Sequence, residues 1–320
     1  MLETLQSMDT VHLSFSQDSL LALNITIALI MFGVALGIKL DHFKNLASNP
    51  KPVATGVISQ FILLPAVTFL MVVALRNLIT PTMAMGMILV AACPGGNISN
   101  FMSSLSKGNA ALSVSLTAIA TLAAIIMTPL NFSLWGGWFM DIYEHSNPGL
   151  LPRLKIDPFE MFKTVIIILG IPLILGMWVN HKFKKFTKAV SGPLKIFSIV
   201  AFLAMVGIMF KSNYDFFLQF IKYIFLLVLL HNVLAFSTGF SFATIMKVSP
   251  WNRRSITIET GIQNSALGLV LLFNPKIFPP DLAIGGMAVI VAWWGVWHIL
   301  SGLTTAGIWS LIPLKGKAEN

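Results

Sequence analysis

Apolar stretches of about 20 residues follow one another along this chain, separated by short segments rich in Lys, Asn, Pro and Asp. A helix needs about 20 predominantly apolar residues to cross a bilayer. The composition agrees, because 56% of residues are hydrophobic and only 10% are charged, against about 25% charged in soluble proteins. The stretches lack the strict alternation of barrel strands. We therefore expect an all-α polytopic membrane protein with about nine transmembrane helices, near 20–38, 53–75, 83–106, 109–131, 160–180, 194–211, 217–246, 255–273 and 283–312.

One carboxylate lies inside these stretches. Eleven of the twelve acidic residues fall in tails, connecting segments or the first turns of apolar stretches, whereas Glu259 lies within 255–273 beside Gly261, Gln263 and Asn264. An ionisable group at membrane depth is costly and usually has a partner or a function. Glu259 is the first candidate functional residue.

The distribution of positive charge predicts orientation. With the N-terminus outside, 14 of the 21 Lys and Arg residues fall on the cytoplasmic side, as the positive-inside rule favours. We expect one domain, 1–320, in the cell (inner) membrane, with the C-terminus inside and 135–157 as an external loop. The net charge of +9 then needs no nucleic-acid partner. The basic run 181–188 is expected to be a cytoplasmic loop, with a lipid-headgroup or nucleic-acid patch as the alternative.

Two of the apolar stretches carry helix-breaking residues near their middle. The third contains CPGGNISN (93–100), and the eighth contains ETGIQNS (259–265). Proline removes a backbone donor and glycine stabilises a helix little, so both helices should break. The freed backbone groups must face protein or a water-filled cavity. Two such breaks in corresponding halves indicate an inverted-repeat transporter with its site near the midplane.

The polar side chains near the breaks are mostly oxygen donors, which hard cations prefer. Ser113 and Thr117 share one helical face, and Gln60 precedes Pro65 in the second stretch. Each alone is as easily explained by helix packing or by an interhelical hydrogen bond. Together with Glu259 they predict a cation site, whose candidate side chains are Ser99, Asn100, Ser113, Thr117, Gln60, Thr260, Gln263, Asn264 and Glu259.

The same segments resemble a known family. CPGGNISN (93–100), KGNAALSVSLTAIATL (107–122), QFILLP (60–65), ETGIQNSALGL (259–269) and WHILSG (297–302) closely resemble the bile acid:sodium symporter family, from about residue 31 to about residue 310. The resemblance implies a core domain, in which two discontinuous helices cross, and a panel domain. The core would comprise about 53–131, 217–273 and part of the last helix, and the panel about 20–38, 160–211 and 283–312.

The resemblance also implies ligands. The family's first sodium site falls on Ser99, Asn100, Ser113, Thr117 and Glu259. Its second falls on Gln60, Glu259, Gln263 and the backbone carbonyls of Thr260 and Ile262. Polar positions near the family's crevice for the organic anion fall on Asn97, Asn264 and His298.

Two departures from the family are visible. Bacterial members commonly have ten helices, whereas this chain begins with the helix that contains MFGVALGI, as nine-helix members do. Ile299 stands where many members carry a polar amide after the WH pair.

The expected function is sodium-coupled import of an organic anion by alternating access. The substrate would be a bile acid or a small carboxylate such as pantoate or a 2-oxo acid, and the carrier is expected to work as a monomer. The alternative is a proton-coupled carrier that uses Glu259 as the proton site; a channel or passive receptor is a weaker one. An enzyme is not expected, because intramembrane aspartic proteases need two acids and zinc enzymes need clustered ligands.

Overall fold

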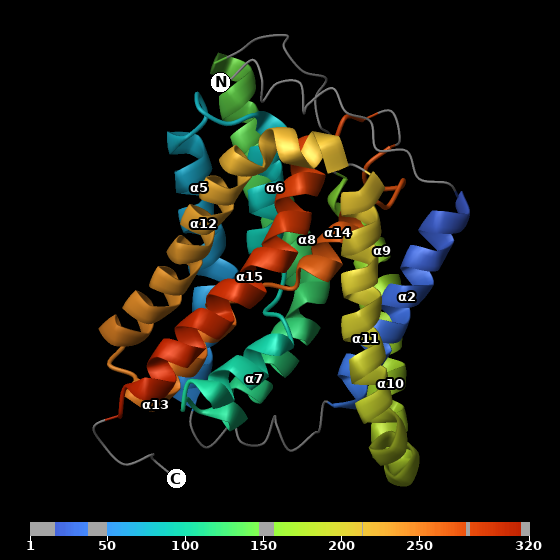
Figure 1. Ribbon diagram of the computed structural model, residues 1–320, viewed down its shortest axis with the longest axis vertical. Coiled ribbons are helices and arrows are strands. Elements are labelled where there is room, and N and C mark those ends of the chain that lie inside the picture. Colours follow the sequence, from blue (N-terminus) through green and yellow to red (C-terminus); the bar gives the residue numbers. More distant parts are fainter. Residues whose placement is uncertain (1–16, 38–49, 147–156, 213, 280–281, 315–320) are drawn as a thin grey trace.

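The computed structural model describes residues 17–37, 50–146, 157–212, 214–279 and 282–314, which contain helices and no strand (Figure 1). Each of the nine predicted stretches falls on one helix or on two or three consecutive helical elements. In this part of the chain, five helical segments are long and apolar enough to cross a membrane: Pro50–Ala74, Ala110–Ser146, Pro158–Lys182, Ile221–Ile245 and Gly285–Leu311. The prediction of an all-α membrane protein is confirmed, and the count of nine spans stays a prediction.

The helical elements follow in chain order. They are α2 (Gln17–Leu36), α4 (Pro50–Ile58), η2 (Ser59–Leu63), α5 (Leu64–Ala74), α6 (Pro81–Ala92), α7 (Ile98–Leu105), α8 (Ala110–Ser146), α9 (Pro158–Val165), η3 (Ile166–Gly170), α10 (Ile171–Lys182), α11 (Lys184–Ser212), α12 (Tyr214–Ile245), α13 (Pro250–Gly261), α14 (Ser265–Leu272) and α15 (Gly285–Leu311). The elements η2 and η3 are single π-helical turns within longer helices.

The helices form two groups. One contains α2, α10 and α11, which stand together at the right of Figure 1. The other contains α4 to α8 and α12 to α15. Between the groups, α9 and η3 contact α8, η3 also contacts α2 and α10, α14 contacts α2, and α12 contacts α11. The last helix, α15, packs chiefly on α6, α12 and α14. The assignment of 283–312 to the panel, with part of the last helix in the core, stays a prediction.

Two segments expected as loops are helical. The first is the beginning of 135–157, where α8 continues to Ser146; residues 147–156 lie outside the described part of the chain. The extension packs through aromatic rings, with Trp135 5.1 Å from Phe69 and 5.4 Å from Trp138 between ring centroids. Rings that pack in this way stabilise further helical turns. The prediction of a loop throughout 135–157 was therefore wrong.

The second is the basic run 181–188. Here α10 ends at Lys182 and α11 begins at Lys184, so Phe183 alone joins the two helices. Lysine is a good helix former, and a run of Lys and Phe therefore continues a helix readily. The loop prediction was wrong at this position too.

Pro65 shapes the helix that presents Gln60. The π turn η2 directly precedes α5, in whose first turn Pro65 lies. The carbonyl of Phe61, four residues before Pro65, accepts a hydrogen bond of 3.0 Å from Asn131 Nδ2 of α8. The Asn131 Oδ1 atom in turn accepts one of 3.1 Å from Trp135 Nε1. A neighbouring helix thus satisfies a carbonyl at the position where proline removes the usual donor.

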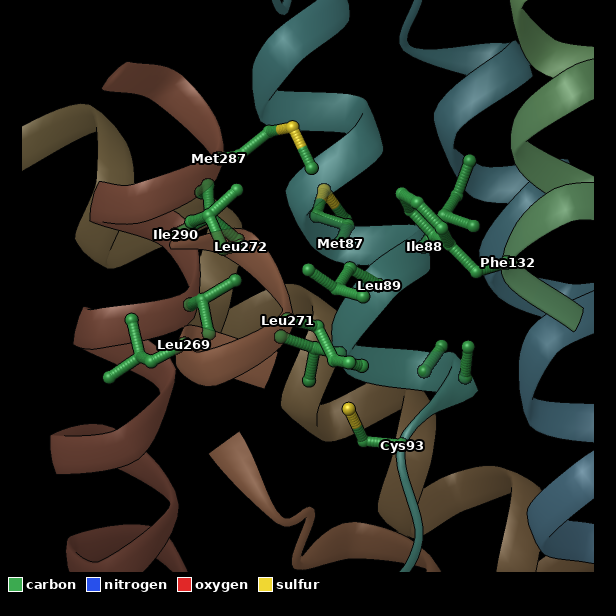
Figure 2. Close-up of a cluster of buried hydrophobic side chains, with 14 of the residues drawn as sticks. Met87, Ile88, Leu89, Cys93, Phe132, Leu269, Leu271, Leu272, Met287 and Ile290 are labelled. Carbon is green, nitrogen blue, oxygen red and sulfur yellow. The ribbon is translucent and has the colours of Figure 1, made fainter. Parts of the chain in front are cut away.

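The apolar core surrounds the first broken helix. Every residue of α6 is buried, and Figure 2 shows its side chains packed against α14 and α15. Gly86 of α6 lies so close to the Met287 backbone that a side chain at Gly86 would overlap it. This packing fixes the end of α6, and with it the break that follows. The side chains labelled on the three helices include Met87, Leu89, Leu269, Leu271, Leu272, Met287 and Ile290.

Candidate cation site at the crossing of two broken helices

Both predicted breaks are present, and they cross. The first separates α6 from α7, and the second separates α13 from α14. The N–H of Gly96 donates to the carbonyl of Ile262 at 2.8 Å, and the N–H of Asn264 donates to the carbonyl of Pro94 at 2.8 Å. Gly95 and Gln263 form an antiparallel bridge between these two bonds. Each break therefore satisfies backbone groups of the other, as a helix end within a membrane requires.

The Glu259 carboxylate lies beside this crossing. Glu259 is buried, with 2% of its surface exposed. The Oε2 atom accepts hydrogen bonds from Ser99 Oγ of α7 at 2.5 Å and from Ser113 Oγ of α8 at 3.2 Å. The Oε1 atom accepts one from Thr117 Oγ1 of α8 at 2.7 Å. Three hydroxyl groups from two other helices thus surround this carboxylate, which as an anion can only accept hydrogen bonds.

Oxygen acceptors outnumber protons around Thr117. Its hydroxyl oxygen lies 2.7 Å from Glu259 Oε1, 3.1 Å from Asn100 Oδ1 and 3.0 Å from the carbonyl of Ser113. A hydroxyl has one proton, so it satisfies one of these acceptors fully at a time. The oxygens of Glu259, Asn100 and Ser113 therefore surround one hydroxyl. All are hard oxygen donors, which suits an alkali cation.

The residues predicted for the second sodium site form a separate hydrogen-bonded cluster. Gln60 Nε2 of η2 donates to Gln263 Oε1 at 2.8 Å and to the carbonyl of Cys93 at 2.9 Å. Gln263 Nε2 donates to the carbonyl of Thr260 at 2.7 Å. The structure therefore brings Gln60, Gln263 and Thr260 together, while the carbonyl of Ile262 faces Gly96 within the crossing. The hydrogen bonds of Glu259 described above all join it to residues predicted for the first sodium site.

The three predicted substrate residues lie on three different helical segments. Asn97 directly precedes α7 and is half-buried. Asn264 directly precedes α14, and its Oδ1 atom accepts a hydrogen bond of 3.1 Å from Leu267 N, which caps that helix. His298 is buried in α15. Asn97 and Asn264 thus mark two helix N-termini at the crossing, where partial positive charge attracts anions, and the substrate role of all three stays a prediction.

Gly95 makes room for the carboxylate. A Cβ atom built at this position would overlap Glu259 Oε1 and its carboxyl carbon. Any side chain at Gly95 would therefore displace Glu259 or the bridge to Gln263. The sequence identified Gly95 as a helix breaker, but its contact with Glu259 depends on tertiary packing.

Asn232 of α12 is a functional candidate that the sequence analysis missed. It is 1% exposed, and its Nδ2 atom donates to the carbonyl of Gly261 at 2.8 Å. The available signal was an amide residue in the middle of the apolar stretch 217–246, next to His231.

Arg254, at the start of α13, is a second missed residue. It is 7% exposed and lies over the ring of Trp309, 5.6 Å from its centroid. Its guanidinium donates to three backbone carbonyls near the C-terminal ends of α7 and α15, where cations are favourable. This arginine therefore ties the start of α13 to the ends of α7 and α15. The three carbonyls belong to Ser106 (2.6 Å), Trp309 (2.9 Å) and Ile312 (2.8 Å).

Comparison with known proteins gives the family. Residues 24–220 match the model of the Sodium Bile acid symporter family. Over 299 residues the chain is 34% identical to the uncharacterized sodium-dependent transporter YocS of Bacillus subtilis (strain 168), which covers 92% of this chain and 85% of that protein. The chain belongs to the sodium bile acid symporter family.

Two further relatives of this symporter family come from eukaryotes. The probable sodium/metabolite cotransporter BASS1, chloroplastic, of Arabidopsis thaliana is 31% identical over 87% of this chain and 64% of its own length, less than two thirds. The human ileal sodium/bile acid cotransporter is 29% identical over 77% of this chain and 67% of its own length. The family and these relatives are sodium-dependent transporters, and with the apolar helices they identify a multi-pass membrane transporter.

Proposed function

We propose that this chain is a sodium-coupled symporter that imports an organic anion by alternating access. The observation that carries the proposal is the excess of oxygen acceptors around Glu259 and Thr117 at the helix crossing. Two sodium ions would be carried with the anion. One would bind Ser99, Asn100, Ser113, Thr117 and Glu259, and the other Gln60, Glu259, Gln263 and the carbonyls of Thr260 and Ile262.

The residues of the crossing suggest how sodium and anion are coupled. Entry of a cation requires the Ser99, Ser113 and Thr117 hydroxyls to turn their protons away from Glu259, so that oxygens face the ion. The ion then links α7, α8 and α13 through one charge. This ordering would fix the N-termini of α7 and α14, beside Asn97 and Asn264. Those N-termini favour a carboxylate or sulfonate, since helix N-termini stabilise anions.

Two groups of packed helices support an alternating-access motion. The group of α2, α10 and α11 would form the panel, and the crossing would move with the other group. The anion would sit in the crevice between the two groups, with His298 near it. From the Lys and Arg distribution we infer that the N-terminus lies outside and the C-terminus in the cytoplasm. We propose that the protein works as a monomer in the cell (inner) membrane.

The substrate class follows from the same chemistry and from the relatives. The human relative is named for bile acid and the plant relative for a metabolite. A bile acid and a small carboxylate share the anionic group that helix N-termini favour, and differ in apolar bulk. We therefore propose an organic anion whose size is set by the crevice, with bile acids, pantoate and 2-oxo acids as candidates.

The test is uptake into proteoliposomes that contain the purified chain. Labelled taurocholate, pantoate and pyruvate are each offered under an inward sodium gradient, under choline, and under an inward proton gradient without sodium. The proposal predicts accumulation of at least one anion under sodium alone. If more sodium charge than anion charge moves, an inside-negative potential adds about 2.3 kcal/mol per net charge and 100 mV. Accumulation driven by protons without sodium would support the proton-coupled alternative at Glu259, and equal uptake under all three conditions would contradict both.

A further inference from the structure

Helix α12 lies along the last turn of α13, directly behind the second helix break. The two helices make one of the most extensive contacts in the described part of the chain. Asn232 of α12 is buried to 1% exposure and donates from Nδ2 to the carbonyl of Gly261 at 2.8 Å. Phe236 follows one turn later, and its ring covers Gly261 so closely that a Cβ atom there would overlap it. One stripe of α12 therefore holds the end of α13.

The Gly261 carbonyl occupies a sensitive place in the chain. It is one of the last carbonyls of α13, which have no N–H partner within their own helix. In a membrane interior, an unpaired carbonyl costs several kcal/mol, and Asn232 removes that cost. The Gly261 carbonyl is also part of the rigid, planar peptide unit between Gly261 and Ile262. Fixing this unit restricts the two neighbouring peptide units, which carry the carbonyls of Thr260 and Ile262.

Those two carbonyls already point into the crossing. The carbonyl of Thr260 accepts a hydrogen bond from Gln263 Nε2 at 2.7 Å, and that of Ile262 accepts one from Gly96 N at 2.8 Å. Each carbonyl oxygen has a second lone pair, which stays open to a cation. The Asn232 amide therefore acts on the far side of the backbone segment that would supply these oxygens.

We propose that Asn232 is a positioning residue for the second sodium site, which it shapes by anchoring the Gly261 carbonyl to α12. This inference rests on the proposed function and extends it to a residue whose hydrogen bond goes to the backbone between two proposed carbonyl ligands. Groups that orient metal ligands without touching the metal typically contribute 10-fold to 100-fold in metal affinity. Loss of the Asn232 donor should therefore weaken sodium binding, in addition to lowering stability through the unpaired Gly261 carbonyl.

The test is a sodium titration of thermal stability in detergent, with choline keeping the ionic strength constant. Asn232→Leu keeps a similar volume and removes the donor. Its half-saturating sodium concentration should rise by about 10-fold or more. Uptake in proteoliposomes should show the same shift in half-saturating sodium, with a maximal rate close to wild type when sodium saturates. The melting temperature in choline should fall in either case, and a purely structural role would leave the half-saturating sodium concentration unchanged.

Thr68→Val is the matched control. Thr68 Oγ1 lies 2.9 Å from Nε2 of His231, the neighbour of Asn232 in α12, and this contact joins α12 to α5 instead of to α13. Both Thr68 and His231 are fully buried. The control removes a buried hydrogen bond of the same helix, and it should leave half-saturating sodium at the wild-type value.

The outcomes separate the two proposals. A wild-type protein that shows no stabilisation by sodium at any concentration would overturn the proposed function itself. A responsive wild type together with an Asn232→Leu variant that titrates at the same sodium concentration would overturn the positioning role alone, as would an equal shift in Thr68→Val. If Asn232→Leu does not fold, Asn232→Asp, which keeps the shape and lacks the amide donors, is measured with the same two readings.

Discussion

The two helix breaks meet at one crossing but contribute different things to it. The first, Pro94-Gly95-Gly96, contributes backbone groups and open space, since Gly95 leaves the volume that the Glu259 carboxylate fills. The second contributes side chains, with Glu259 one turn before the break and Gln263 within it. A pair of crossing breaks therefore need not be chemically symmetric. One provides the room and the other provides the charge.

The largest expected effect comes from the charged side of this comparison. Glu259→Gln keeps the shape of the side chain and removes its negative charge, which both proposed sodium sites share. We expect sodium-driven uptake to fall to the rate of empty vesicles. Glu160→Gln is the control, because Glu160 is a surface carboxylate paired with Lys163 at 2.6 Å on α9. Uptake by Glu259→Gln at the wild-type rate on the same sodium gradient would refute the claim that the negative charge of Glu259 is needed for sodium-driven transport.

The next largest effect tests the space at the first break. Gly95→Ala places a methyl group on the Glu259 carboxylate, and overpacking of this kind typically costs about 1–3 kcal/mol. We expect a lower melting temperature and a half-saturating sodium concentration raised by roughly 10-fold or more, since 1.4 kcal/mol corresponds to a factor of 10. In Gly137→Ala the new methyl group meets no atom within 4 Å, so this variant should match or slightly exceed wild-type stability. Unchanged sodium dependence in Gly95→Ala would show that the space at this break is dispensable.

A smaller effect is expected for one hydroxyl ligand. Thr117→Val removes the oxygen that lies 2.7 Å from Glu259 Oε1, and a hydrogen bond to a charged group is worth about 1.5–3 kcal/mol. Half-saturating sodium in uptake should rise by at least about 10-fold. Thr121→Val is the matched control. Thr121 lies one turn further along α8, is similarly buried, and donates a hydrogen bond of 2.7 Å to the backbone carbonyl of Thr117. Equal shifts in the two variants would remove Thr117 from the proposed site.

The smallest effect is expected at Pro94. Its contribution to the crossing is a carbonyl that accepts from Asn264 N at 2.8 Å, and alanine retains this carbonyl. Pro94→Ala mainly adds freedom to the unfolded chain, which changes stability by about 0.4–1 kcal/mol. Half-saturating sodium should therefore stay within about 3-fold of wild type. A loss as large as that of Gly95→Ala would mean that proline, and not glycine, shapes the first break.

Local chemistry made much of this arrangement predictable. The helix breakers in 93–100 and 259–265 and the isolation of Glu259 are visible in the sequence, and the structure places both breaks and Glu259 together. The convergence of Ser99, Ser113 and Thr117 on Glu259 was expected from their oxygen chemistry and from the family resemblance. The helix extension to Ser146 was not, because it is stabilised by ring contacts that depend on α5.

Other features depend on which helices pack together. The bond from Asn232 to Gly261 and the volume left at Gly95 arise from residues that are distant in sequence. Arg254 illustrates the same limit, since its three carbonyl partners lie at the ends of α7 and α15. A polar residue in an apolar stretch signals that it has a partner, but the sequence does not say which carbonyl that partner is.

The most direct test of the account is equilibrium binding of sodium to the purified chain, measured by isothermal titration calorimetry in a choline buffer. We expect saturable binding of two sodium ions by the wild type, and none by Glu259→Gln at the same concentrations, with both proteins folded. Equal sodium binding by the two proteins would contradict the claim that the charge of Glu259 at the helix crossing holds the ions.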